Sequence, residues 1–274
     1  MSDRRTAPAN GRVAAAWLKG QVAAERFVDG DVQSVVVPCA DLRDAPDGVR
    51  DRQVQIGEAV TVFESRGGWS FVQRACDGYV GYMASDALGP ASTSTHFVAT
   101  PATHLYAAPD FKSPDLMRLG FFARVTVTAE LKNHFETPEG FIPKKHLRPL
   151  DRPFTDPATV AQAHFGVPYL WGGNSTLGID CSGLAQVALL ACGIDCPGDS
   201  DMQEAVVGTA LAPETPLQRG DLLFWTGHVA MAVDPETLIH ANAHHMAVAY
   251  EPAQAAIIRI EAQEGGAVTS RRRP

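Results

Sequence analysis

Residues 178–190 read GIDCSGLAQVALL, which places a thiol at the start of a run of small and apolar residues. The run from Cys181 to Ala191 is followed by Gly193, and this pattern predicts a buried helix that begins at the cysteine. Free backbone N–H groups and the helix dipole stabilise a thiolate or a developing oxyanion at such a position. The stretch by itself is compatible with a structural cysteine or with a nucleophile.

Two histidines further along the chain favour the nucleophile. His228 opens the apolar run HVAMAV directly after a glycine, and His240 ends the run TLIH. If the two runs pair as antiparallel strands, His228 is the candidate base for Cys181 and His240 orients the His228 ring. The alternative is a metal site at His240, His244 and His245, but no carboxylate or cysteine has matching spacing.

Composition limits the classes of function. The net charge is −8 over 274 residues, and no basic block precedes the terminal RRR, so nucleic-acid binding is not expected. The N-terminal run VAAAWL is shorter than a secretory core, and no window approaches the ~20 apolar residues of a membrane span. We therefore expect a cytoplasmic chain without a membrane segment, and a frayed tail at TSRRRP.

The cysteines do not suggest a disulfide framework or a bound metal. They are odd in number and scattered, and no second Cys or His pair has the spacing of a structural zinc site. We expect no metal and no other cofactor. Four of the five are interpreted as packed or partly exposed thiols without a chemical role: Cys39, Cys76, Cys192 and Cys196.

An internal repeat organises the first half of the chain. VVPCADLRDAPD (36–47) resembles VATPATHLYAAPD (98–110), and DGYVGYMASDAL (77–88) has a counterpart in EGFIPKKHL (139–147). Short alternating runs separated by Gly, Pro and Asp turns predict a small β-barrel for each copy. The copies span residues 30–90 and 91–150 after an N-terminal segment 1–29, and they are similar to bacterial SH3-type domains.

A different pattern follows the proline-rich linker RPLDRPFTDPATV. Asp156 and Pro157 predict the start of a helix that continues to about Phe165, and a second helix is expected from Cys181. Five runs then suggest strands: DLLFWT, HVAMAV, TLIHAN, MAVAYE and AIIRIE. Helices followed by a meander of strands predict an α+β domain.

Four ordered motifs carry a family resemblance. PYLWGGNSTLGIDCSG, DSDMQ, GDLLFW and HVAM resemble the NlpC/p60 family of papain-like cell-wall cysteine peptidases over residues 155–262, leaving 263–274 as a tail. Because two SH3-like barrels precede these motifs in the sequence, the chain is most similar to the branch that cleaves γ-D-glutamyl-L-diamino acid bonds. The resemblance implies the nucleophile Cys181, the base His228 and the orienting residue His240.

The resemblance also implies substrate contacts. Tyr169 would assist the oxyanion, Trp171 would wall the cleft, and Asp199 with Ser200 would meet the free amino end of an L-Ala residue. Asp180 and Ser182, which flank the thiol, are further implied contacts. Asp180 is also expected to cap the helix.

Three positions depart from the resemblance or extend it. Gly198 stands where this branch often has an arginine, which puts the contact to the D-Glu α-carboxylate in doubt. In related enzymes the first SH3-type domain walls off the site with an aromatic and an acidic residue. Tyr82 and Glu64 are the candidates here, and ordinary barrel residues are the alternative reading.

The implied partner is a murein peptide, L-Ala-γ-D-Glu-diamino acid, with meso-diaminopimelate or Lys at the third position. An amidase or acyltransferase of the same fold is a competing hypothesis. A non-catalytic module whose SH3-type pair binds a wall peptide is another. The sequence does not decide the oligomeric state or whether the chain is exported.

Overall fold

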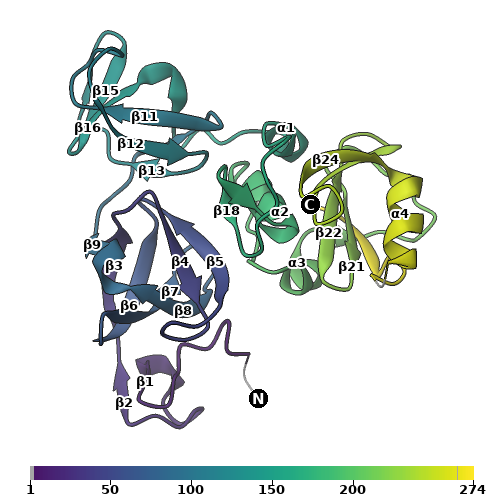
Figure 1. Cartoon of the computed structure of the whole chain (residues 1–274). Helices are drawn as coiled ribbons and strands as arrows, with labels where there is room; N and C mark the ends of the chain where they lie inside the picture. Colours follow the sequence, from purple (N-terminus) through teal and green to yellow (C-terminus); the bar gives the residue numbers. More distant parts are fainter. Residues whose placement is uncertain (1–2, 264) are drawn as a thin grey trace. The chain divides into compact units, whose positions relative to one another are not determined.

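The structure is a computed structural model that describes residues 3–263 and 265–274 (Figure 1). The chain divides into two compact units, residues 1–150 and residues 151–274. Strands make up most of the first unit, and the second combines helices with one large sheet, as the expected α+β class requires.

The first sequence copy folds into a seven-stranded sheet in the order β5-β4-β8-β7-β6-β3-β9, with antiparallel pairing throughout. Along β4, Ala40 and Leu42 are buried and alternate with more exposed neighbours, as in a strand with one face on a core. Its elements are β3 (Asp31–Val35), β4 (Cys39–Arg43), β5 (Arg50–Gln55), β6 (Ala59–Arg66), β7 (Trp69–Arg74), β8 (Val80–Ala84), η2 (Ser85–Ala87) and β9 (Leu88–Pro90).

The N-terminal segment packs against this sheet. It forms β1 (Val13–Ala15), η1 (Ala16–Leu18) and β2 (Arg26–Val28), and β1 pairs with β2 in parallel. Val13 and Leu18 share a buried cluster with Phe63 and Phe71 of the sheet. Most apolar residues of VAAAWL therefore belong to the core of the first unit, whereas Trp17 is 61% exposed.

The second sequence copy shows a similar succession of elements. Its last strands, β16, η3 and β17, repeat the strand–3₁₀ turn–strand order of β8, η2 and β9. Leu105 is buried in this copy at the position equivalent to Leu42 in the first. The elements are β10 (His96–Val98), β11 (Ala102–Tyr106), β12 (Asp115–Gly120), β13 (Arg124–Val125), β14 (Ala129–Glu130), β15 (His134–Thr137), β16 (Gly140–Pro143), η3 (Lys144–His146) and β17 (Leu147–Pro149).

The second unit is built on a six-stranded antiparallel sheet in the order β20-β25-β21-β22-β23-β24. Figure 1 shows α2 and α4 on opposite sides of this sheet. The helices are α1 (Pro157–Gln162), α2 (Cys181–Leu190), α3 (Ser200–Val206) and α4 (Ala253–Ala262). The strands are β18 (Asn174–Ser175), β19 (Gly178–Ile179), β20 (Thr209–Ala210), β21 (Leu222–Trp225), β22 (His228–Ala232), β23 (Thr237–Asn242), β24 (Ala247–Pro252) and β25 (Ser270–Arg273).

The run AIIRIE lies in the helix α4, so the strand expected there is wrong. Ala253, Ala256 and Ile260 are buried at helical spacing and pack on the sheet, whereas Ile258 is 59% exposed. The alanines that flank the β-branched residues favour a helix. In the described part of the chain, no helix has both the length and the apolar character needed to cross a membrane.

The frayed tail expected at TSRRRP is also wrong. Residues 270–273 form β25, which lies between β20 and β21 in the sheet. Arg273 donates to both carboxylate oxygens of Asp221 at 2.8 Å, and Asp221 is fully buried. A buried carboxylate is costly without a cationic partner, and the end of the chain supplies that partner.

Candidate active site

Cys181 is the first residue of α2, as its sequence predicted, and it is 8% exposed. Asp180 caps the helix by accepting from the Gly183 N–H at 2.6 Å and from the Ser182 hydroxyl at 3.0 Å on one oxygen. The other oxygen accepts from the Gly172 N–H at 2.9 Å. The expected cap is confirmed, and both Asp180 oxygens accept hydrogen bonds from the protein itself.

Glycines allow the loop before α2 to approach the first turn of the helix. A Cβ at Gly183 would lie 2.6 Å from the carbonyl oxygen of Gly173, which is too short for any side chain there. Gly172 has a φ of +67°, a conformation that favours glycine. The Gly-rich turn and the CSG sequence are therefore both needed to hold the thiol in place.

Tyr169 and Trp171 occupy different environments in that loop. Burial raises the pKa of Tyr169, and the nearby Cys181 and Asp180 raise it further, so the hydroxyl stays protonated close to the thiol. Trp171 is 69% exposed and is accessible to a ligand. The structure thus places Tyr169 beside Cys181, and Trp171 on the surface of the same loop.

The two histidines predicted from sequence lie in contact. β22 and β23 pair in antiparallel register, and His228 Nε2 lies 2.8 Å from His240 Nδ1. The Cys181 sulfur is 3.9 Å from the carbonyl oxygen of Gly227, the residue before His228. The start of α2 and the start of β22 therefore adjoin, which brings the thiol next to the histidine pair.

The sequence analysis missed a carboxylate and a guanidinium beyond the second histidine. His240 Nε2 lies 3.1 Å from Glu251 Oε2 on β24. Arg259 on α4 donates to Glu251 Oε1 at 2.8 Å and to Oε2 at 2.7 Å. The signal was present, because MAVAYE places a glutamate at the end of the strand that pairs with TLIHAN.

These groups hold defined charges at neutral pH. Burial, reinforced by His240 and Arg259, lowers the pKa of His228 to about 3. Burial also lowers the pKa of His240 to about 4, although the Glu251 carboxylate opposes this shift. Hydrogen bonds from Arg259 lower the pKa of Glu251 to about 2. Glu251 is therefore ionised and both histidines are neutral.

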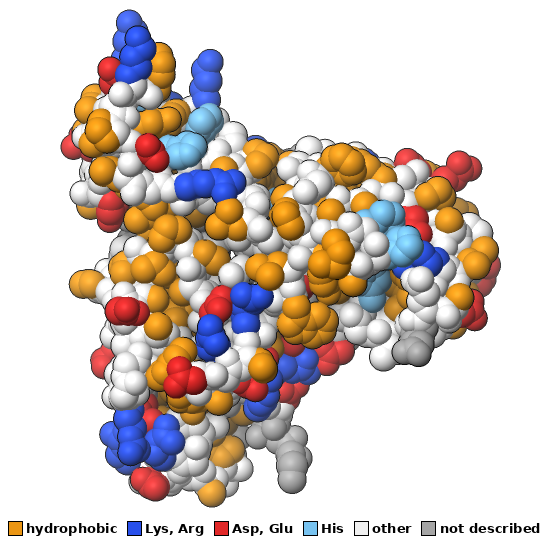
Figure 2. Space-filling view, in the orientation of Figure 1, with side chains coloured by type: hydrophobic (Ala, Val, Ile, Leu, Met, Phe, Trp, Pro, Cys, Tyr) orange, Lys and Arg blue, Asp and Glu red, His pale blue; other side chains and the backbone are white. Residues whose placement is uncertain are grey.

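A pocket of about 350 Å³ opens beside His228. Figure 2 shows histidine side chains gathered on the face of the second unit, next to basic and acidic side chains. The pocket lies at the histidine that would protonate a leaving group. The described residues that line it are His228, Asn242, Ala243, His244, Arg259, Ile260, Gln263 and Gly265.

Asp199 and Ser200 lie at the start of α3, where Asp199 is the N-cap residue and Ser200 is nearly buried. Gln203, another residue that sequence reasoning passed over, anchors this helix. Its amide donates to the carbonyl oxygens of Ser182 at 2.9 Å and Pro197 at 3.0 Å. The Asp199–Ser200 pair is thereby tied to the first turn of the cysteine helix.

Glu64 and Tyr82 lie together in the first unit. They line a pocket of about 310 Å³ with Arg12 and Trp69 among its other residues. Glu64 accepts from Arg12 at 2.8 Å and from Arg26 at 3.1 Å, so its charge is balanced within the unit. Their contribution to the peptidase site stays a prediction.

The alternative metal site has no support in the geometry. His240 contacts His228 and Glu251, whereas the His245 ring lies 2.9 Å from Asn242 Oδ1. Among residues 3–263 and 265–274, no group of three or more His, Cys, Asp or Glu side chains is arranged to hold a metal ion.

Comparisons with known proteins agree with this architecture. The NlpC/P60 family profile matches residues 166–261, and the profile of the bacterial dipeptidyl-peptidase SH3 domain matches residues 42–88. A crystal structure of an NlpC/P60 family protein from Bacillus cereus superposes with a TM-score of 0.74 at 23% identity. It covers 89% of this chain and 99% of that protein, so the two share a fold.

Curated relatives share part of the sequence. The γ-D-glutamyl-L-lysine dipeptidyl-peptidase of Bacillus cereus is 29% identical over 227 residues, which cover 70% of this chain and 67% of that enzyme. Dipeptidyl-peptidase 6 of Lysinibacillus sphaericus is 39% identical over 82 residues, and this match spans 30% of each chain. Residues 166–261 are therefore an NlpC/P60 peptidase domain, which follows a bacterial dipeptidyl-peptidase SH3 domain in the same chain.

Proposed function

We propose that this chain is a cysteine peptidase that hydrolyses the γ-D-glutamyl–L-diamino acid bond of murein peptides with a free N-terminal L-Ala. The observation that carries this proposal is the position of Cys181 at the start of α2. Its sulfur lies 3.9 Å from the carbonyl oxygen of Gly227, the residue before His228, and His228 contacts His240. The substrate class follows from the relatives named γ-D-glutamyl-L-lysine dipeptidyl-peptidases.

The chemistry proceeds through a thioester. Cys181 attacks the γ-carbonyl of D-Glu while its proton passes to His228. Backbone N–H groups at the start of α2 bind the oxyanion, and the protonated hydroxyl of Tyr169 is the candidate side-chain donor. His228 returns the proton to the departing amine, and water then hydrolyses the thioester to release L-Ala-D-Glu and regenerate the thiol.

The two ends of the substrate meet different parts of the site. The free α-ammonium of L-Ala requires a carboxylate, and Asp199 at the start of α3 is the candidate. Exposed Trp171 gives the peptide an apolar wall. The pocket that His228 lines is the candidate position for the leaving diamino acid. A role in recycling released wall peptides, and a cytoplasmic site of action, stay predictions.

The test uses the full chain and synthetic L-Ala-γ-D-Glu-L-Lys and L-Ala-γ-D-Glu-meso-diaminopimelate, with products identified by mass spectrometry. We expect release of L-Ala-D-Glu, its loss in Cys181→Ser, and its retention in the matched control Cys39→Ser. Blocking the substrate amine by acetylation should abolish turnover if the amino end is recognised.

Other outcomes would replace the proposal. Cleavage between N-acetylmuramic acid and L-Ala would indicate an amidase, and transfer of an acyl group would indicate a transferase. Wall-peptide binding without any product, unchanged in Cys181→Ser, would indicate a non-catalytic module.

A further inference from the structure

The contacts of the histidine pair extend beyond His240, since His240 contacts Glu251 and Glu251 accepts from Arg259. We propose that Glu251, held by Arg259, is a positioning residue that fixes the tautomer of both histidines and leaves His228 Nδ1 unprotonated to receive the Cys181 proton. The proposal rests on the proposed function only in taking Cys181 as the nucleophile, and it is independent of which amide is cleaved.

The Arg259–Glu251 ion pair determines which atom of His240 carries the proton. Arg259 donates to both oxygens of Glu251 at 2.8 and 2.7 Å, and the Glu251 side chain is 10% exposed. An ionised carboxylate has no proton to donate. His240 Nε2, 3.1 Å from Glu251 Oε2, must therefore carry the N–H of this hydrogen bond.

The tautomer of His240 in turn determines the tautomer of His228. A neutral imidazole has one N–H, so His240 Nδ1 presents a lone pair when Nε2 is protonated. His228 Nε2 lies 2.8 Å from that atom and must be the donor. His228 is then protonated at Nε2 and has a free lone pair at Nδ1, which is the atom available to act as a base.

Arg259 also limits how strongly the carboxylate acts on the base. Ionised Glu251 favours the imidazolium that forms when His228 takes the thiol proton, and Arg259 offsets this effect. The pH dependence of the base is set by the groups packed around it. On the strand and α4 side these are His240, Glu251 and Arg259, with His245 acting on His240 and His244 lining the same pocket, and on the thiol side Cys181 lies next to the residue before His228.

The competing explanation is purely structural, because the Arg259–Glu251 ion pair also joins α4 to β24. If the role is only structural, variants of Glu251 and Arg259 should lose activity in proportion to their loss of stability. It does not predict a change of tautomer or pH shifts of opposite sign. The test therefore needs readouts other than turnover.

The central variant is Glu251→Gln. Arg259 can still donate to the amide oxygen, which turns the amide NH₂ toward His240 Nε2 and reverses both hydrogen bonds along the chain. His228 then carries its proton on Nδ1 and cannot accept one from the thiol. We expect kcat to fall by about 100-fold or more with KM little changed, as for other losses of the correct tautomer. Glu251→Asp keeps a carboxylate and should recover part of kcat.

Two measurements need no substrate. Long-range ¹H–¹⁵N correlation of labelled histidines should show the Nε2–H tautomer of His228 in the wild type and the Nδ1–H tautomer in Glu251→Gln. The rate of Cys181 alkylation by iodoacetamide should fall by about ten-fold in Glu251→Gln at neutral pH, because the thiol has lost its proton acceptor. Glu261→Gln removes an exposed charge from the same helix and should match the wild type in both measurements.

The pH profiles complete the test. Arg259→Met removes the cation that disfavours protonated His228, so the acid limb of alkylation should move to higher pH. Glu251→Gln removes the opposite charge and should move that limb to lower pH. If Glu251→Gln does not fold, the comparison of Glu251→Asp with Arg259→Lys and Arg259→Met carries the same prediction.

An Nδ1–H tautomer of His228 in the wild type would overturn the proposal. Wild-type alkylation and kcat in a folded Glu251→Gln variant would also overturn it. Failure of the wild type to cleave γ-D-glutamyl peptides would overturn the proposed function instead, provided that alkylation still depends on Glu251.

Discussion

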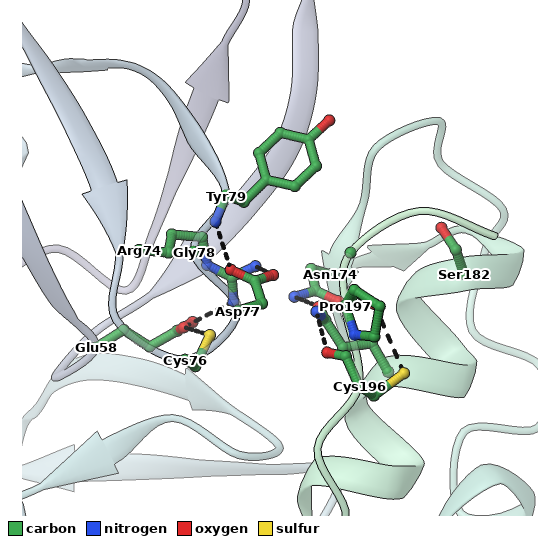
Figure 3. A network of polar contacts seen from close by, with 12 residues as sticks. Glu58, Arg74, Cys76, Asp77, Gly78, Tyr79, Asn174, Ser182, Cys196 and Pro197 are labelled. Carbon is green, nitrogen blue, oxygen red and sulfur yellow. Dashed lines mark hydrogen bonds and ion pairs between the residues drawn. The ribbon is translucent and has the colours of Figure 1, made fainter. Parts of the chain in front are cut away.

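Each unit of the chain contains a buried arginine–carboxylate pair beside a side chain that can lose or gain a proton. In the first unit, Arg74 is 2% exposed and donates to Glu58 and Asp77 at 2.8 Å, and the Cys76 thiol lies 3.6 Å from Glu58 (Figure 3). In the second unit, Arg259 donates to Glu251, and the Glu251 carboxylate contacts His240.

The difference between the two networks lies in where the chain of contacts leads. Burial raises the pKa of Cys76 to about 12, and the thiol points at a carboxylate that disfavours the thiolate. The second network leads through His240 to His228, which lines a pocket and directly follows Gly227, the residue whose carbonyl oxygen lies 3.9 Å from the Cys181 sulfur. A base and a helix N-terminus favour the thiolate at Cys181, whereas burial and the Glu58 carboxylate outweigh Arg74 at Cys76.

The largest expected effect separates the two thiols. Cys181→Ala should lower turnover of a γ-D-glutamyl tripeptide by about 10⁴-fold or more, because no other group can form the thioester. Cys76→Ala should leave kcat/KM unchanged, since that thiol is held in the protonated form. Steady-state kinetics of both variants check this, and a comparable loss in a folded Cys76→Ala variant would contradict the distinction.

The second prediction compares the two ion pairs by stability. Arg74→Met leaves Glu58 and Asp77 buried without their cation and should cost about 3–5 kcal/mol of unfolding free energy. Arg259→Met should cost less, because the Arg259 side chain is 18% exposed and water can reach the Glu251 carboxylate that it leaves unpaired. Urea denaturation measures the unfolding free energy of both variants. Equal losses would show that the burial of the ion pair does not determine the cost of removing its arginine.

The sequence predicted those parts of the molecule that depend on local pattern. The repeat indicated two similar β copies because alternating apolar residues such as Ala40 and Leu42 mark a strand wherever they occur. The helix start at Cys181 followed from Asp180 as a cap, and the pairing of the strands that carry His228 and His240 followed from their spacing.

The features that the sequence did not reveal depend on distant partners. Residues 270–273 look like a basic tail until the buried carboxylate of Asp221, far away in sequence, is known to need them. The β-branched residues of AIIRIE suggest a strand, and only packing on the sheet selects the helix. The sequence places Glu251 on the strand that pairs with TLIHAN, but its contact with Arg259 has no local signal, because Arg259 lies on a helix that the sequence suggested to be a strand.

A third prediction concerns the helix cap that holds the thiol. Asp180→Ala removes three hydrogen bonds to a charged acceptor and should cost about 2–3 kcal/mol, together with most of the turnover. Asp156→Ala removes the cap of α1, where the carboxylate is 37% exposed, and should cost about 1 kcal/mol or less. Thermal unfolding of both variants, with alkylation of Cys181 as a second readout, checks the ranking.

The smallest predicted effect is a difference in acid sensitivity between the two networks. The folded pKa values of His228 and His240 lie below that of an unfolded histidine, so between these values the unfolded chain binds more protons. Their stability contribution is complete at about pH 8, and it decreases by about 1 kcal/mol per histidine between pH 8 and pH 6. The loss continues as the pH falls toward the folded pKa values.

The sheet of the first unit should respond in a lower pH range. Residues 31–90 contain no histidine, and the pKa of Glu58 is held below its usual value by Arg74 against the effect of burial. The Glu58 contribution is therefore present above about pH 4.5 and is lost only as the pH falls further. Hydrogen exchange of peptides from β22 and β23 should accelerate between pH 8 and pH 5, after correction for intrinsic rates, while peptides from β6 and β7 stay protected. Equal acceleration in both sheets would show that the buried histidines do not set the acid response.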